Sequence, residues 1–195
     1  MNNIKLIFLL VIGFMLSLGG YAVLKKINDL QMYRRVTTHA LVQDVTGNLS
    51  NANILATAAL EYHDQNNFLE AYVPVGQLRA HLLRAEQALG LYAQALLYRE
   101  AEGQSRPSFR LRLYFVYYIL DLEVLTETLQ NNKALSPEQY QRLKNTTHDI
   151  NVLYTNLSES LLEDMDPVAI DQYLRTVIEP QLLYPPVQEV IKNNP

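Results

Sequence analysis

A repeat of apolar residues at alternating steps of four and three constrains the fold of this chain more than any other feature. Between residues 111 and 129 it places Leu, Phe and Tyr side chains along one face of an α-helix, as in a coiled coil. The same rhythm runs through residues 78–96 and 140–161 and, more loosely, through residues 41–59. The chain has no Asn-Gly or Asp-Gly hairpin turn and no sustained alternation of apolar and polar residues. We therefore predict an all-α fold.

Proline and N-capping residues indicate where the helices begin. Pro74 suits the first turn of a helix, where its missing N–H would have no partner. Ser136 before Pro137, and Asp166 before Pro167, are typical of an N-cap followed by a first turn. The predicted helices span residues 35–62, 74–101, 108–133, 137–163 and 167–178. Similar lengths and mostly short connections favour an antiparallel up-and-down four-helix bundle with a short fifth helix.

Two segments are expected to lack regular structure. Residues 63–73 form the longest predicted connection between helices. Residues 180–195 contain Pro180, Pro185 and Pro186, which cannot continue a helix because proline lacks the N–H donor. The sequence thus predicts a bundle domain over residues 27–179 and an irregular C-terminal tail over residues 180–195.

An uncharged apolar run at residues 6–24 precedes the bundle. As a helix it would cover about 28 Å, close to the thickness of the hydrocarbon core of a bilayer. Lys25 and Lys26 follow it directly, as basic residues often do at the end of a span. We predict a transmembrane signal-anchor over residues 1–26, which makes this a single-pass protein of the cell membrane. The alternative is a cleavable signal peptide, cut after Ala22, that releases a secreted bundle.

The charges that flank the apolar run leave the membrane side of the bundle open. Lys25, Lys26, Arg34 and Arg35 follow the run, whereas only Lys5 and the amino group precede it. The excess of positive charge after the run favours a cytoplasmic bundle. A short basic start before an apolar run is also typical of exported proteins, which favours the extracytoplasmic side.

Composition excludes several classes of function. Three of the 16 Lys and Arg lie beside the apolar run, so 13 remain against 20 Asp and Glu, a net charge of −7. A domain this acidic is expected to repel nucleic acid. The chain has no cysteine, which excludes disulfides, thiol catalysis and cysteine-based zinc sites.

Basic residues gather at the end of the predicted bundle that lies closest to the membrane. If consecutive helices alternate in direction, the connections near residues 102–108 and 163–166 lie at this end. The predicted membrane-proximal basic residues are Lys25, Lys26, Arg34, Arg35, Arg106, Arg110 and Arg112. Near an anionic surface each contributes about 1 kcal/mol of attraction. Alternatively they pair with acidic residues of the same end, Glu159, Glu163, Asp164 and Asp166.

Three tyrosines lie close together in the apolar stretch 113–120. Tyr114, Tyr117 and Tyr118 could line a pocket between helices, where their hydroxyls would orient a ligand, or form a surface for a partner protein. The alternative is that this stretch is the most buried helix of the bundle, with the hydroxyls reaching its rim.

No pattern in the sequence indicates a metal site, a cofactor or catalysis. A carboxylate-bridged metal site in a bundle needs Glu three residues before His, and none of His39, His63, His81 and His148 has one. The chain also lacks a phosphate-binding glycine loop and a nucleophile elbow. We therefore predict that the protein is not an enzyme and holds no metal or cofactor.

Residues 108–157, "SFRLRLYFVYYILDLEVLTETLQNNKALSPEQYQRLKNTTHDINVLYTNL", resemble in pattern the helical hairpins of membrane-anchored bacterial bundles, such as the sensory domains of chemoreceptors. The predicted function is an accessory or scaffold subunit of the bacterial cell envelope that binds another protein or forms homo-oligomers. A membrane-anchored sensory or small-molecule-binding module with a pocket between its helices is the alternative.

Overall fold

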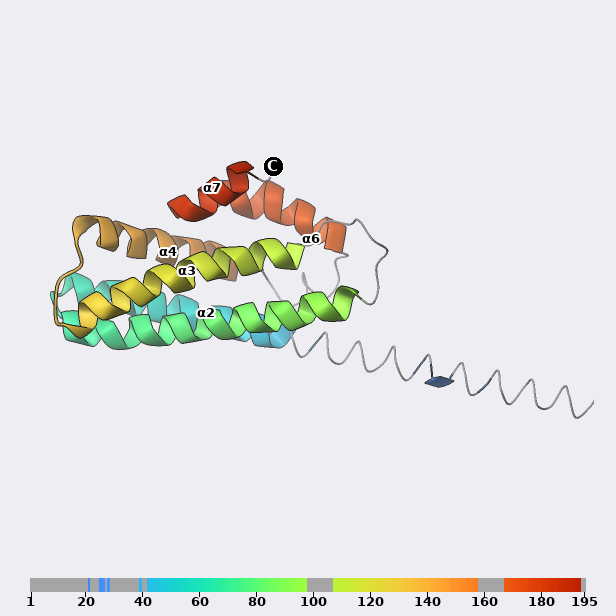
Figure 1. Cartoon of the computed structure of the whole chain (residues 1–195), viewed down its shortest axis with the longest axis horizontal. Coiled ribbons are helices and arrows are strands. Elements are labelled where there is room, and N and C mark those ends of the chain that lie inside the picture. The colour runs from blue at the N-terminus through green and yellow to red at the C-terminus, as the bar shows by residue number, and fades with distance from the viewer. Residues whose placement is uncertain are drawn as a thin grey trace, which may run out of the picture. The chain divides into compact units, whose positions relative to one another are not determined.

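The computed structural model describes residues 42–97, 107–157 and 167–193, together with Tyr21, Lys25, Lys26, Asn28 and His39. Every element of secondary structure in these residues is a helix, and none of them forms a β-strand (Figure 1). The chain divides into two compact units, Met1–Thr38 and His39–Pro195. The prediction of an all-α fold is confirmed, and the second unit is a helical bundle.

Of the predicted transmembrane run at residues 6–24, only Tyr21 lies among the described residues, where it is helical and exposed. Lys25 and Lys26 after it are also helical and exposed. No helix within the described part of the chain has the length and apolar character that crossing a membrane requires. The anchor therefore stays a prediction.

Four long helices of the second unit run side by side (Figure 1). Four short helical segments follow α4 in the described part of the chain, and α6 and α7 lie along α3 and α4. The long helices span residues 42–64, Phe68–Leu97 (α2), Pro107–Gln130 (α3) and Pro137–Asn156 (α4). The later segments are α6 at Pro167–Tyr173, a π-helical turn at Leu174–Ile178 that continues it, a 3₁₀ turn at Glu179–Gln181, and α7 at Pro185–Asn193.

A tight turn at residues 65–67 joins the first helix to α2, so the prediction of a long connection over residues 63–73 is wrong. Asn66 adopts a left-handed backbone conformation with φ 58°, which asparagine tolerates better than most residues. Its N–H donates to the carbonyl of His63 at 2.9 Å, and the N–H of Asn67 donates to the carbonyl of Tyr62 at 2.9 Å. This pair of bonds is a Schellman motif, which ends the first helix.

Pro74 lies inside α2 rather than in its first turn, which corrects the prediction for this residue. A proline at this position removes one hydrogen bond of the helix. Its neighbours Ala71 and Val75 are fully buried in the core, and helix stability in proteins comes mostly from such packing. Burial on both sides of Pro74 therefore outweighs the lost bond.

α4 begins at the predicted N-cap. The Ser136 hydroxyl accepts the N–H of Gln139 at 3.2 Å, and the Gln139 side-chain oxygen accepts the N–H of Ser136 at 3.0 Å. This capping box satisfies two donors that would otherwise have no partner. The helix ends at Asn156, earlier than the predicted end at residue 163. The Asn156 side chain donates to the carbonyl of Val152 at 2.8 Å, a local bond that competes with further helix.

Small residues let the first helix pack closely on its neighbours. Ala52, Ala56 and Ala59 are fully buried along one face of this helix. Leucines at the predicted repeat positions fill much of the rest of the core: Leu49, Leu78, Leu82, Leu89, Leu111, Leu122, Leu125, Leu129, Leu143 and Leu157. Close approach of helix backbones needs small side chains on one of the two facing surfaces. Among the described side chains, the alternating repeat marks the buried faces of the first helix, α2 and α3 correctly. On α4 it is wrong at Tyr154, which is 44% exposed, whereas Leu153 beside it is fully buried.

The predicted irregular tail contains a helix, so that part of the prediction is wrong. α7 starts with Pro185 and Pro186, in the first helical positions where a missing N–H costs no hydrogen bond. Val187 on α7 is fully buried, and Tyr184 just before the helix is 2% exposed. The prolines therefore start a helix here rather than prevent one.

Candidate interaction surface

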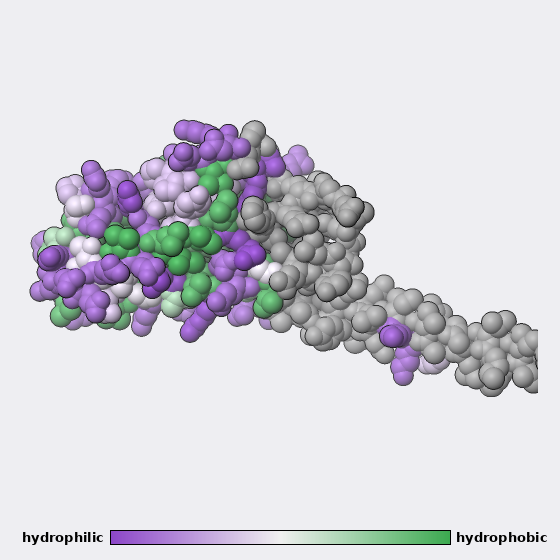
Figure 2. Space-filling model, viewed as in Figure 1, coloured by the Kyte–Doolittle hydropathy of each residue, from purple (hydrophilic) through white to green (hydrophobic). Residues whose placement is uncertain are grey.

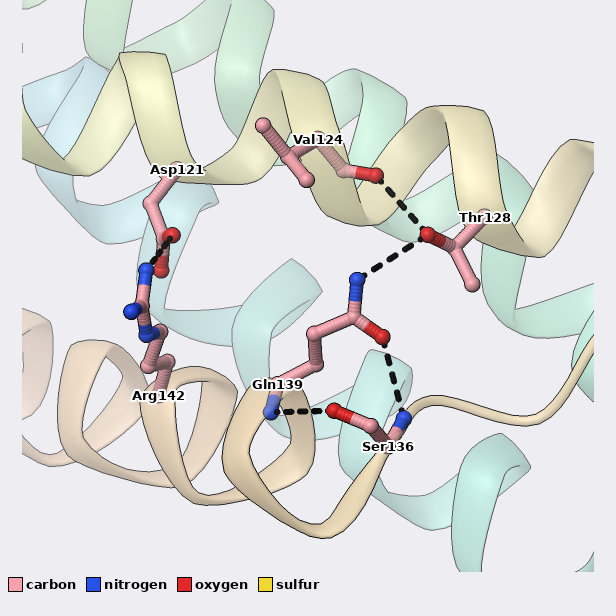
Figure 3. Close-up of polar contacts among 6 residues, drawn as sticks. All are labelled: Asp121, Val124, Thr128, Ser136, Gln139 and Arg142. Carbon is pink, nitrogen blue, oxygen red and sulfur yellow. Dashed lines mark hydrogen bonds and ion pairs between the residues drawn. The ribbon is translucent and has the colours of Figure 1, made fainter.

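α3 carries most of the residues that the sequence analysis singled out, and its faces differ in chemistry. Its outward face is apolar over the middle of the helix, as the green atoms in Figure 2 show. The face towards α4 carries polar contacts (Figure 3). A third face meets the segment from the π-helical turn to the start of α7.

Tyr114 and Tyr118, predicted to line a pocket or a partner surface, are both fully buried. The Tyr114 hydroxyl donates to Glu179 Oε1 at 2.5 Å, and the Tyr118 hydroxyl donates to Asp149 Oδ2 at 2.8 Å. Tyr117 is partly exposed and packs against the core. The expectation that these hydroxyls reach the rim of the bundle is therefore wrong for Tyr114 and Tyr118. Carboxylates from distant parts of the chain bind them instead.

Asp149 connects α3, α4 and the residues just before α7. Its carboxylate is fully buried, and besides the Tyr118 hydroxyl it accepts the N–H of Leu183 at 2.6 Å and the N–H of Tyr184 at 3.1 Å. Burial raises the pKa of Asp149 because it disfavours the charged form, and the three hydrogen bonds offset part of that rise. The carboxylate fixes where the chain crosses from the 3₁₀ turn to α7.

Glu179 connects the 3₁₀ turn to α3, through Arg110 as well as through the Tyr114 hydroxyl. Arg110 Nη1 lies 2.7 Å from Glu179 Oε1, and the two side chains are 12% and 5% exposed. Burial, and then the neighbouring Glu179 carboxylate, raise the pKa of Tyr114 far above its ordinary value. Arg110, predicted as a membrane-proximal basic residue, is thus largely enclosed in the bundle.

A third carboxylate joins α3 to α4. Arg142 Nη1 lies 3.0 Å from Asp121 Oδ1, and near the start of α4 Gln139 Nε2 donates to Thr128 Oγ1 at 3.1 Å (Figure 3). Burial, and then the charge of Asp121, raise the pKa of Tyr184. The Tyr184 ring also packs on that of Tyr118, with ring centres 5.2 Å apart.

We call Asp121, Asp149 and Glu179, with their partners, the carboxylate contacts. None of these three acidic residues was predicted as a site residue from the sequence. Asp149 directly precedes Ile150 of the predicted repeat, and Asp121 lies between two leucines of α3. An acidic residue beside such a repeat position is the one sequence feature that could have indicated burial.

The remaining predicted basic residues are only partly covered by the structure. Arg34, Arg35 and Arg106 lie outside the described residues, as do the acidic residues predicted to pair with them. Arg112 is described, and it forms an ion pair with Glu86 of α2 rather than with those acidic residues. Of the predicted set, only Lys25 and Lys26 are described as exposed residues of the first unit.

The described contacts of the histidines are with side chains and carbonyls of the bundle. Within the described ranges no three His, Asp or Glu residues are grouped closely enough to hold a metal ion. His63 stacks on Tyr140, and His81 Nδ1 lies 2.8 Å from Asn48 Oδ1. Burial lowers the pKa of both histidines. These contacts assign packing roles to His63 and His81.

Four large apolar side chains are exposed together beside the seam between α2 and α3. We call them the α2–α3 patch: Leu83 (44% exposed), Val116 (38%), Leu120 (55%) and Val124 (51%). The three residues from α3 follow one another at four-residue steps, so they share one face of that helix. In Figure 2 hydrophobic atoms gather at this place, over the middle of α3.

Two ion pairs flank the patch and join its two helices. Arg79 Nη2 lies 3.0 Å from Glu123 Oε2, and Arg112 Nη2 lies 2.6 Å from Glu86 Oε1. The arginine belongs to α2 in the first pair and to α3 in the second. Gly90 makes room for the second pair, because a Cβ atom there would lie 3.2 Å from Arg112 Cζ. Exposed apolar residues with a charged rim have the composition of an interface.

No family model, curated protein or solved structure matches this chain.

Proposed function

We propose that this protein is a single-pass membrane protein whose helical bundle binds another protein, as a non-enzymatic accessory or scaffold subunit. In this proposal residues 6–24 span the bilayer, and the bundle is of the antiparallel up-and-down type with four long helices. The uncharged run and the two lysines after it support the anchor. The short turns at residues 65–67 and 131–136 support antiparallel neighbours.

The observation that carries the binding function is the α2–α3 patch. Contiguous apolar surface is uncommon on a protein that works alone in water, and it usually marks a place of association. The core has ample apolar residues of its own, so the folding of the bundle does not require Leu120 or Val124 to be apolar. The two flanking ion pairs give the patch the charged edge that limits unspecific association.

Membrane attachment is tested on the full chain in its own cells. The expected result is that it stays with the membrane fraction after washing at alkaline pH, with a mass that still includes Met1. A mature chain that starts after Ala22 and appears in the aqueous fraction would overturn the anchor and favour the secreted alternative.

Binding through the patch is tested by crosslinking in intact cells with the full chain, its Leu120→Glu variant and its Ile54→Glu variant. Ile54 is the matched control, because it is 64% exposed and belongs to the first helix rather than to the patch. We expect protein crosslinks in the parent and in Ile54→Glu, and their loss in Leu120→Glu. Equal crosslinking in all three would contradict the proposed use of the patch.

A further inference from the structure

We propose that the α2–α3 patch takes a second copy of this chain, related to the first by a two-fold axis that crosses the seam between α2 and α3. This inference rests on the proposed binding function and names the partner. It follows from how the four charges around the patch are placed, together with the position of the apolar residues between them.

The four charges alternate around the patch. Along α2, Arg79 lies at one end and Glu86 at the other. On α3, which is antiparallel to α2, Glu123 lies beside Arg79 and Arg112 lies beside Glu86. The arginine therefore belongs to α2 at one end of the patch and to α3 at the other. Arg79, Glu123 and Arg112 keep 38%, 46% and 40% of their side chains exposed, and Glu86 keeps 13%.

A rotation of 180° about an axis across the seam brings opposite charges together. The rotation lays α2 against α2 and α3 against α3 of the second copy, both antiparallel. Arg79 then faces Glu86 of the second copy, and Glu123 faces Arg112 of the second copy. Each contact occurs twice, as in every two-fold interface. The surface is therefore complementary to itself in charge.

The apolar residues occupy the positions that the same axis requires. Leu83 lies in the middle of the interval between residues 79 and 86, so it meets Leu83 of the second copy close to the axis. Val116 and Leu120 lie on either side of the middle of the interval between residues 112 and 123. The rotation therefore places Leu120 of each copy against Val116 of the other. An apolar centre with charged edges is the usual organisation of such an interface.

An axis across the seam requires the two ion pairs to have opposite orientations, whereas an axis along the seam does not. With an axis along the seam, α2 would face α3 of the second copy, and opposite charges would meet however the two pairs were oriented. With an axis across the seam, opposite charges meet only if the arginine changes helix between the two pairs. The chain has that arrangement.

The first test uses disulfide formation in the full chain, in membranes or detergent. The chain has no cysteine, so a single introduced cysteine reports on one contact. We expect Leu83→Cys to give a disulfide-linked dimer under mild oxidation, because the bond needs Cα atoms within about 7 Å. Asn51→Cys, at an exposed position on the first helix, is the control and is expected to stay monomeric. No dimer from Leu83→Cys, or equal amounts from both variants, would overturn the proposal.

The second test inverts one ion pair in the Leu83→Cys background. Arg79→Glu with Glu123→Arg keeps the net charge and the pair within one copy, but it places like charges opposite each other between copies. We expect dimerisation to weaken roughly tenfold. Inverting the second pair as well, with Glu86→Arg and Arg112→Glu, is expected to restore it. Unchanged dimerisation in the first variant, with an unchanged melting temperature, would overturn the axis across the seam.

These outcomes are distinct from a failure of the proposed function. If Leu83→Cys forms no dimer while Leu120→Glu still loses crosslinks to a different protein, the second copy is wrong and the binding function stands. If the dimer forms on a chain that is found in the aqueous fraction, the membrane anchor is wrong and the dimer stands.

Discussion

Two faces of α3 contrast in chemistry. The face towards α4 and the segment before α7 carries Tyr114, Tyr118 and Asp121 in buried contacts with charged groups. The outward face carries Val116 and Leu120, which are exposed. The difference shows that the apolar or polar character of a side chain on α3 does not by itself indicate whether the side chain is buried. Polar groups fix how the C-terminal segment packs, and apolar side chains remain exposed on the outward face.

The largest expected effect concerns the buried phenols at high pH. Burial raises the pKa of Tyr114, Tyr118 and Tyr184, so the folded state keeps protons that the unfolded state loses above about pH 10. Stability therefore falls as the pH rises past 10, by about 1.4 kcal/mol per pH unit for each phenol. We expect cooperative unfolding there.

The measurement follows tyrosinate absorbance and helical circular dichroism together as the pH rises. Both signals are expected to change in one transition, and Tyr118→Phe is expected to make the decline of stability less steep by about a third. Ionisation of all tyrosines with the helices intact would show that the inward face of α3 is open to solvent.

The next effect concerns the acceptor that joins three segments. Asp149→Ala leaves the N–H groups of Leu183 and Tyr184 and the Tyr118 hydroxyl without this partner. We expect a loss of roughly 3 kcal/mol in the free energy of unfolding by urea, since unpaired buried donors are costly. The exposed Asp44→Ala is the control and is expected to change stability by less than about 0.5 kcal/mol. Equal effects of the two would remove the contrast between buried and exposed polar groups.

A smaller effect is expected in acid, again from Asp149. Its pKa is raised in the folded state, so the folded chain binds this proton more readily than the unfolded chain. Stability is therefore expected to gain a contribution from this group as the pH falls from neutral through its folded pKa towards the unfolded value of 3.8. Asp149→Asn, which cannot titrate, is expected to lack that contribution in urea unfolding across this range. An identical pH profile in both proteins would contradict the sign of the shift.

The smallest effect on folding is expected at the outward face. Leu120→Ser removes an apolar side chain that is 55% exposed, so the free energy of unfolding of the monomer should change by less than about 0.5 kcal/mol. Leu122→Ala, in the core two residues further on, is the comparison and is expected to cost roughly 3 kcal/mol. A large loss from Leu120→Ser at low protein concentration would show that the patch supports the fold of a single copy.

Local patterns predicted the helices, because periodicity and capping depend on neighbouring residues. The repeat at residues 111–129 and the N-cap at Ser136 were read correctly for this reason. The left-handed Asn66 was missed, since asparagine occurs in many conformations and only tertiary packing decides among them. Proline is ambiguous as a sequence signal, because it can start a helix as well as break one. Pro185 starts α7 as Pro137 starts α4, whereas the prolines of the tail were predicted only to break helices.

The candidate site was harder to predict, because its contacts join distant parts of the chain. Periodicity indicates that Tyr114 lies on an apolar helix, but it cannot indicate that Glu179 binds its hydroxyl. The repeat indicates the buried face of α3, but it does not indicate what the apolar residues on the other faces do. Val116 and Leu120 lie outside the repeat in a stretch that is apolar on every face, and the three tyrosines attracted the functional interpretation instead.

The π-helical turn at Leu174–Ile178 sets the rotational phase of everything that follows it. Each residue of an α-helix advances the side-chain direction by about 100°, so one residue more or less before Glu179 would turn its carboxylate away from Arg110 and Tyr114. The spacing of this segment matters more than the identity of most of its residues. Insertions and deletions there should therefore be tolerated far less well than substitutions.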